Sequence, residues 1–82
     1  MGNEIVIKLD TLKKINKYLD IVYNLPVDLD IIYGRYIIDG KSAMGLFGLD
    51  LSKNITLKIR TSDTEMVNLT KQALKDFIVG GD

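Results

Sequence analysis

Serine, aspartate and lysine are the residues of this sequence whose types and spacing could support chemistry. Histidine and cysteine are both absent from its 82 residues. Their absence excludes Ser-His and Cys-His nucleophilic sites, thiolate metal sites and disulfide bonds. Chemistry would have to come from hydroxyl, carboxylate and ammonium groups alone. We therefore expect a protein that is not an enzyme and that has no metal site and no cofactor.

Ser42 is the most informative of the polar residues. As the N-cap of a short helix it would contribute about 1 kcal/mol of stability. A phosphate on its hydroxyl would add a charge of about −1.5 to −2 beside the first N–H groups of that helix, where an anion is favourable. Ala43, Met44 and Phe47 follow at helical spacing. If they are exposed, these side chains would form an adaptable docking patch.

Two glycine motifs match phosphate-binding loops only in part. Gly40-Lys41-Ser42 has the end of a P-loop, but Arg35 stands where that motif requires its first glycine. Residues 45–48 have the letters of a GxxG RNA-binding loop, yet the two central residues are apolar. We reject both nucleic-acid and nucleotide sites and attribute the glycines to close packing.

Charged residues form two further clusters. Asp28 and Asp30 alternate along a segment with strand periodicity, and Asp39 follows nearby, a pattern more typical of a solvated face than of a metal or acid–base site. Lys13, Lys14 and Lys17 gather at the start of a predicted helix, as an ordinary solvated face or as a contact for an acidic partner. With 11 basic and 11 acidic residues, the chain is not expected to bind nucleic acid.

Apolar periodicity predicts the elements that position these residues. Alternation predicts four strands, over residues 4–9, 27–33, 36–38 and 55–60, with Gly34-Arg35 as a two-residue type II′ turn. Helical spacing predicts a helix between Asp10 and Pro26. Residues 42–49 are apolar with two glycines and could form a short helix or be irregular, and we favour a short helix capped by Ser42. A third helix should begin at a capping box over residues 62–65 and end at Gly80-Gly81.

Each long helix should bury one stripe of side chains. In the first helix this stripe is Leu12, Ile15, Leu19 and Val22. In the last helix it is Met66, Thr70, Ala73 and Phe77, broadened by Val67, Leu74 and Ile78. The order is then β-α-β-β-α-β-α in a single domain over residues 1–82, an α+β fold in which three helices cover one face of a four-stranded antiparallel sheet. Without an 18-residue apolar run or a signal peptide, we expect a cytoplasmic protein with no membrane contact.

The run VDLDIIYGRYIIDGKSAMGLFGLDLSKNITLKI, residues 27–59, resembles the central part of HPr, the small phosphocarrier of the bacterial sugar phosphotransferase system. Its most specific piece, residues 41–49, is similar to the KSIMGVMSL-like segment of that family. The resemblance implies an HPr-like open-faced β-sandwich. It also implies that Ser42 is the regulatory phosphorylation site and that Ala43, Met44 and Phe47 form the patch presented to partner proteins.

The sequence departs from the HPr family at the phosphocarrier site. The family accepts phosphate on a histidine in a GIHARP-like loop, whereas the corresponding junction here is the shorter Lys8-Leu9-Asp10-Thr11-Leu12 and has no histidine. Lys13 or Lys14 is the nearest substitute for the arginine beside that histidine. The chain therefore resembles the catabolite-repression branch, which keeps the serine and lacks the histidine.

The resemblance implies a non-catalytic regulatory or adaptor protein that binds a protein partner through the Ser42 helix and the face of Lys13, Lys14 and Lys17. An HPr kinase/phosphorylase and a transcriptional regulator are the partners it suggests, and we expect a monomer or a weak dimer. Two alternatives remain open. One is an HPr-fold module that binds its partner constitutively, without phosphorylation, and the other is an ACT-like module that binds a small ligand.

Overall fold

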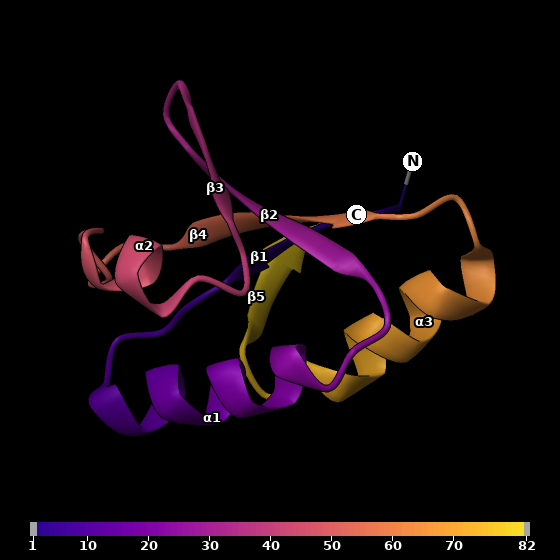
Figure 1. Ribbon diagram of the computed structural model, residues 1–82, viewed down its shortest axis with the longest axis horizontal. Helices are drawn as coiled ribbons and strands as arrows, with labels where there is room; N and C mark the ends of the chain where they lie inside the picture. Colours follow the sequence, from indigo (N-terminus) through magenta and orange to yellow (C-terminus); the bar gives the residue numbers. More distant parts are fainter. Residues whose placement is uncertain (1, 82) are drawn as a thin grey trace.

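A five-stranded antiparallel sheet and three α-helices make up the fold in the computed structural model, which describes residues 2–81 (Figure 1). The strands are β1 (Glu4–Ile7), β2 (Asp28–Tyr33), β3 (Tyr36–Asp39), β4 (Ile55–Arg60) and β5 (Ile78–Gly81). The helices are α1 (Leu12–Tyr23), α2 (Ala43–Phe47) and α3 (Thr64–Ala73). The predicted α+β class and the order of elements through the third helix are confirmed.

The strands lie in the order β3-β2-β4-β1-β5, and each neighbouring pair is antiparallel. It follows that α1 joins two strands with β4 between them and that α3 joins two strands with β1 between them, which makes two split βαβ units. Figure 1 shows α1 and α3 on the same side of the sheet. None of the helices in residues 2–81 is long and apolar enough to cross a membrane.

The core lies between the sheet and the helices. Alternate residues of the three central strands face it, and seven of them are at most 2 % exposed: Ile5, Ile7, Leu29, Ile31, Ile55, Leu57 and Ile59. The eighth, Tyr33 at the end of β2, is half-buried. Because successive side chains of a strand point to opposite faces, the residues between them form the opposite face of the sheet. The two-residue turn between β2 and β3 is also confirmed, since Tyr33 pairs with Tyr36 and Gly34 has the positive φ of +60° that a type II′ turn requires.

The C-terminal segment differs from the prediction. The last helix ends at Ala73, Phe77 and Ile78 lie beyond it, and Gly80-Gly81 belong to the fifth strand rather than to a helix end. The sheet therefore has five strands and not four. This strand pairs with β1, whose edge would otherwise have no partner strand. Gly81 fits there because its φ is +123° and an added Cβ would lie 2.6 Å from Cα of Ile5.

Two predictions about the helices were wrong in detail. Leu12 is 63 % exposed, because it begins α1 one turn before the first buried residue, Ile15, and the centre of the buried stripe is instead filled by Tyr18. The N-cap of α3 is Asp63 and not Ser62. The Asp63 carboxylate accepts hydrogen bonds from the backbone N–H groups of Glu65 and Met66, and an aspartate also carries the negative charge that a helix N-terminus favours.

Candidate functional site

Ser42 lies at the start of α2, as predicted from its sequence context. Its backbone is extended, and its Oγ accepts a hydrogen bond from the backbone N–H of Gly45 at 3.1 Å, which makes it the N-cap. The side chain is half-buried. The hydroxyl is thus held in one position at the surface by the first turn of the helix.

The packing of Gly45 fixes α2 against the sheet. A Cβ atom on Gly45 would lie 2.6 Å from Cγ2 of Ile38 in β3, so a larger residue could not adopt this position unchanged. The next residue, Leu46, is fully buried in the core. Close packing, which we predicted for both glycines of the GxxG segment, is confirmed for Gly45. It does not account for Gly48, where an added Cβ would make only ordinary contacts.

The remaining side chains of α2 form the surface beside Ser42. Met44 is 88 % exposed and Phe47 is 54 % exposed, while Ala43 is half-buried and packs against the core. Apolar side chains of this size that are left in water are typical of surfaces that contact another molecule. We call Ser42, Met44 and Phe47 together the α2 surface.

Two hydrogen bonds tie the turn before α2 to the first helix and to the loop that follows it. The hydroxyl of buried Tyr18 donates to the carbonyl of Gly40 at 2.7 Å, and Lys41 Nζ donates to the carbonyl of Leu25 at 2.8 Å. Lys41 therefore takes a structural role, because its ammonium group binds a backbone carbonyl of the same chain. Burial and, to a lesser degree, the charge of Asp39 raise the pKa of Tyr18. Sequence reasoning gave Tyr18 no role, because its partner is a backbone carbonyl 22 residues away.

The lysines predicted to join the site lie on α1. Lys13 and Lys17 are exposed, and Lys14 donates to Asp10 at 2.9 Å, a hydrogen bond that lowers the pKa of the Asp10 carboxyl. Within residues 2–81, no hydrogen bond or ion pair joins these three lysines to α2. The hydrogen bond from α1 toward this region comes from Tyr18 instead, and it reaches Gly40 in the turn before α2.

The three aspartates lie on the face of the sheet opposite the helices. Asp28 is exposed, Asp30 pairs with Asp39 across strands β2 and β3, and Asp30 also contacts Arg60 Nε at 3.5 Å. No group of three or more acidic side chains among the described residues could hold a metal ion. The arrangement fits the solvated face that strand periodicity predicted for Asp28 and Asp30.

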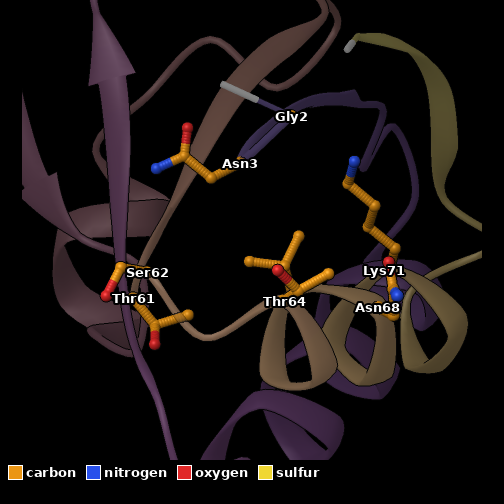
Figure 2. Close-up of a pocket in the computed structure, with 8 residues that line it drawn as sticks. Gly2, Asn3, Thr61, Ser62, Thr64, Asn68 and Lys71 are labelled. Carbon is orange, nitrogen blue, oxygen red and sulfur yellow. The ribbon is translucent and has the colours of Figure 1, made fainter.

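A pocket of about 420 Å³ lies between Gly2 and Asn3 on one side and α3 on the other (Figure 2). This pocket was not predicted, because its lining comes from three separate segments: Gly2 and Asn3, Thr61, Ser62 and Thr64, and Val67, Asn68 and Lys71. These residues supply hydroxyl, amide and ammonium groups.

We compared the chain with models of protein families, with curated proteins and with solved structures, and none of these comparisons gave a match. The function of this chain is therefore inferred from its residues and their geometry. On the α2 surface, a modifiable hydroxyl at the helix N-cap lies beside two exposed apolar side chains of the same short helix.

Proposed function

We propose that this protein is an HPr-like, non-catalytic regulatory or adaptor module that binds a protein partner through the α2 surface and is switched by phosphorylation of Ser42. The observation that carries the proposal is the exposure of Met44 and Phe47 beside a serine whose hydroxyl is held at the surface. A partner could contact the apolar side chains and the serine at the same time.

The scaffold around Ser42 supports this role. Leu46 is buried in the core and Gly45 packs against Ile38 of β3, so the helix that carries the exposed side chains is held against the rest of the fold. A rigid element loses little conformational entropy when it binds, which favours recognition. An antiparallel sheet of five strands with three helices is compatible with an HPr-like fold, with β5 as an addition to the strands that the resemblance implies.

Phosphorylation would change the chemistry of the α2 surface. The modified serine would carry a charge of about −1.5 to −2 and three strong acceptor oxygens. An arginine of the partner could pair with two of these oxygens at once. The HPr resemblance makes an HPr kinase/phosphorylase the enzyme that would add the phosphate and a transcriptional regulator the partner. In this proposal, Lys13 and Lys17 widen the contact toward acidic side chains of that partner.

The test is incubation with an HPr kinase/phosphorylase and ATP, followed by mass spectrometry. We expect a single phosphoserine that is absent from Ser42→Ala. Ser52→Ala and Ser62→Ala are matched controls, because they remove the two other serines of the chain and should leave the modification unchanged. An unmodified wild-type protein, under conditions in which an ordinary HPr is phosphorylated, would refute the switch.

Constitutive binding is the second candidate function. It is favoured by the hydrogen bond from Gly45, because this bond gives the Ser42 hydroxyl a structural task that needs no phosphate. In that case Ser42→Ala would lower stability by about 1 kcal/mol, as loss of an N-cap does, and would leave binding of the partner intact. The kinase experiment separates the two candidates.

A further inference from the structure

Among the strands of residues 2–81, β3 has one edge without a partner strand. It is the first strand in the sheet order and pairs with β2 alone. Tyr36, Ile37 and Asp39 of this four-residue strand are exposed, with Ile37 at 72 %. Figure 1 shows the hairpin of β2 and β3 projecting beyond the rest of the sheet. An uncovered edge with β-branched residues and no proline is able to pair with another strand.

The backbone groups that point outward follow from the pairing with β2. In an antiparallel ladder, hydrogen-bonded and non-hydrogen-bonded pairs alternate. The two-residue turn places Tyr33 and Tyr36 in a hydrogen-bonded pair, so Tyr36 directs its backbone groups toward β2. At the other end of β3, the Gly40 N–H also points toward β2 and donates to the carbonyl of Leu29 at 2.7 Å. Ile37 and Asp39 therefore direct their backbone groups away from β2. The Asp39 carbonyl accepts from the Ser42 N–H at 3.1 Å, which leaves both groups of Ile37 and the N–H of Asp39.

We propose that β3 pairs with β3 of a second copy of this chain, antiparallel and with the twofold axis at Ile37. In this register Ile37 lies opposite Ile37 of the second copy. Arg35 of each copy lies opposite Asp39 of the other copy. Outward-facing residues then meet outward-facing residues, as hydrogen bonding requires. The register joins the two apolar residues and creates two Arg–Asp pairs of opposite charge.

Charge selects this register over its neighbours. A shift by two residues would place Ile37 opposite Asp39 or opposite Arg35, and would remove both charge pairs. A parallel, in-register arrangement would place like charges opposite each other, which is destabilising. The chain has equal numbers of basic and acidic residues, so net repulsion between two copies does not oppose the contact.

The face of the sheet opposite the helices supports the same arrangement. Strand pairing places Ile37 beside Ile32, Ile32 beside Thr56, and Thr56 beside Val6, in one row across four strands. In the proposed dimer the rows of the two copies meet at Ile37. The most exposed side chain of the row would then gain an apolar neighbour, and β-branched pairs across strands stabilise a sheet.

The contact is small, so we expect a weak dimer. A standard interface buries about 1,200–2,000 Å² in total, more than a four-residue strand can provide. We expect a dissociation constant of roughly 10 µM to 1 mM, which sedimentation equilibrium measures when the loading concentration spans this range.

The test exploits the two charge pairs. In a dimer of two Arg35→Glu chains, the introduced glutamate of each copy would lie opposite Asp39 of the other. In a dimer of two Asp39→Lys chains, the introduced lysine of each copy would lie opposite Arg35 of the other. Each variant alone should therefore dimerise about tenfold more weakly than the wild type. An equimolar mixture of the two variants makes both pairs opposite in charge again and should restore association. Lys75→Glu is the matched control, since it changes the charge by the same amount as Arg35→Glu at an exposed position outside β3.

Thermal unfolding of each variant guards against a folding defect, because Asp39→Lys also loses the hydrogen bond that the Lys41 N–H donates to the Asp39 carboxylate. Ile37→Pro is an independent variant that removes an outward N–H and is tolerated on an edge strand. It should also abolish association. A wild-type protein that stays monomeric at about 1 mM would overturn the proposal. So would an unchanged dissociation constant in Arg35→Glu, a dimer that persists in Ile37→Pro, or a mixture that does not associate.

Discussion

Replacing Tyr18 by phenylalanine should destabilise the protein through the turn that leads to Ser42. The Tyr18 hydroxyl donates to the Gly40 carbonyl at 2.7 Å, and both residues are buried. Tyr18→Phe leaves this carbonyl without a donor in the interior, which costs about 1–3 kcal/mol. The ring itself stays, and with it the edge-to-face contact with Phe77 at a centroid distance of 6.3 Å. The lost hydrogen bond should therefore account for nearly all of the effect.

Urea unfolding at 25 °C measures this change in the free energy of unfolding. A loss near 2 kcal/mol should also lower Tm by roughly 10 °C, because each kcal/mol shifts Tm by about 4–8 °C in a domain of this size. Tyr23→Phe is the matched control on the same helix. Tyr23 is 58 % exposed, and its substitution should change stability by less than about 0.5 kcal/mol. If Tyr18→Phe were as stable as Tyr23→Phe, the reasoning would be refuted.

The same hydroxyl should make stability depend on alkaline pH. Burial, with a smaller contribution from Asp39, raises the pKa of Tyr18 in the folded protein, whereas an unfolded tyrosine loses its proton near pH 10, about its ordinary pKa. Above that pH the folded state binds more protons than the unfolded state. The contribution of the Tyr18 hydroxyl to the free energy of unfolding is therefore fully present below about pH 10. Above that pH it falls by about 1.4 kcal/mol per pH unit. The difference in stability between wild type and Tyr18→Phe should shrink along this slope, and a constant difference would contradict it.

Two further substitutions test the helix ends and the packing of α2. Asp63→Ala should lower the free energy of unfolding by about 1 kcal/mol, because the N-cap of α3 is lost. Ser62→Ala should change it by less than about 0.5 kcal/mol. If urea unfolding showed the larger loss for Ser62→Ala, Ser62 would be the N-cap, as the capping box predicted. Gly45→Ala should cost about 1–3 kcal/mol, because its Cβ would lie 2.6 Å from Cγ2 of Ile38, whereas Gly48→Ala should be tolerated; equal melting temperatures for these two variants would argue against close packing at Gly45.

The strands could be predicted because their apolar alternation is local and uninterrupted. The buried face of each strand can be identified from two alternating apolar residues, such as Leu29 and Ile31 in β2 or Leu57 and Ile59 in β4. The Ser42 cap was predictable for a similar reason, since the bond between a cap and its helix spans only three residues. Features of this kind depend on neighbours in the sequence, and the rest of the chain changes them little.

The C-terminal strand could not be predicted in this way. Phe77 and Ile78 continue the helical spacing of Leu74, so periodicity alone favours a longer helix. Their actual position is set by the free edge of β1, which is about seventy residues earlier in the chain. Gly80-Gly81 are typical of a helix end and are equally suited to a strand whose backbone lies close to another, and only the pairing with β1 decides between the two.

The candidate site likewise contains features that depend on neighbours in the sequence and features that depend on distant residues. Ser42, Met44 and Phe47 could be found because they follow one another on a single short helix. The Tyr18–Gly40 hydrogen bond could not, because nothing in the types of these residues indicates that they meet. The edge of β3 was equally invisible, since the order of the strands, and not the sequence of any one strand, determines which strand lies at the edge.

Asp39 connects the two proposed interaction surfaces. Its carbonyl accepts from the N–H of Ser42 and its carboxylate accepts from the N–H of Lys41, while its side chain would also meet Arg35 of a second copy. The two proposals can still fail separately, because the kinase experiment needs no dimer and the mixture of charge variants needs no phosphate. If both succeed, phosphorylated protein should dimerise more tightly than unmodified protein. A phosphate three residues from Asp39 adds negative charge near the position that Arg35 of the second copy occupies, and this attraction should weaken as salt is added. An unchanged dissociation constant after phosphorylation would show that the two surfaces act independently.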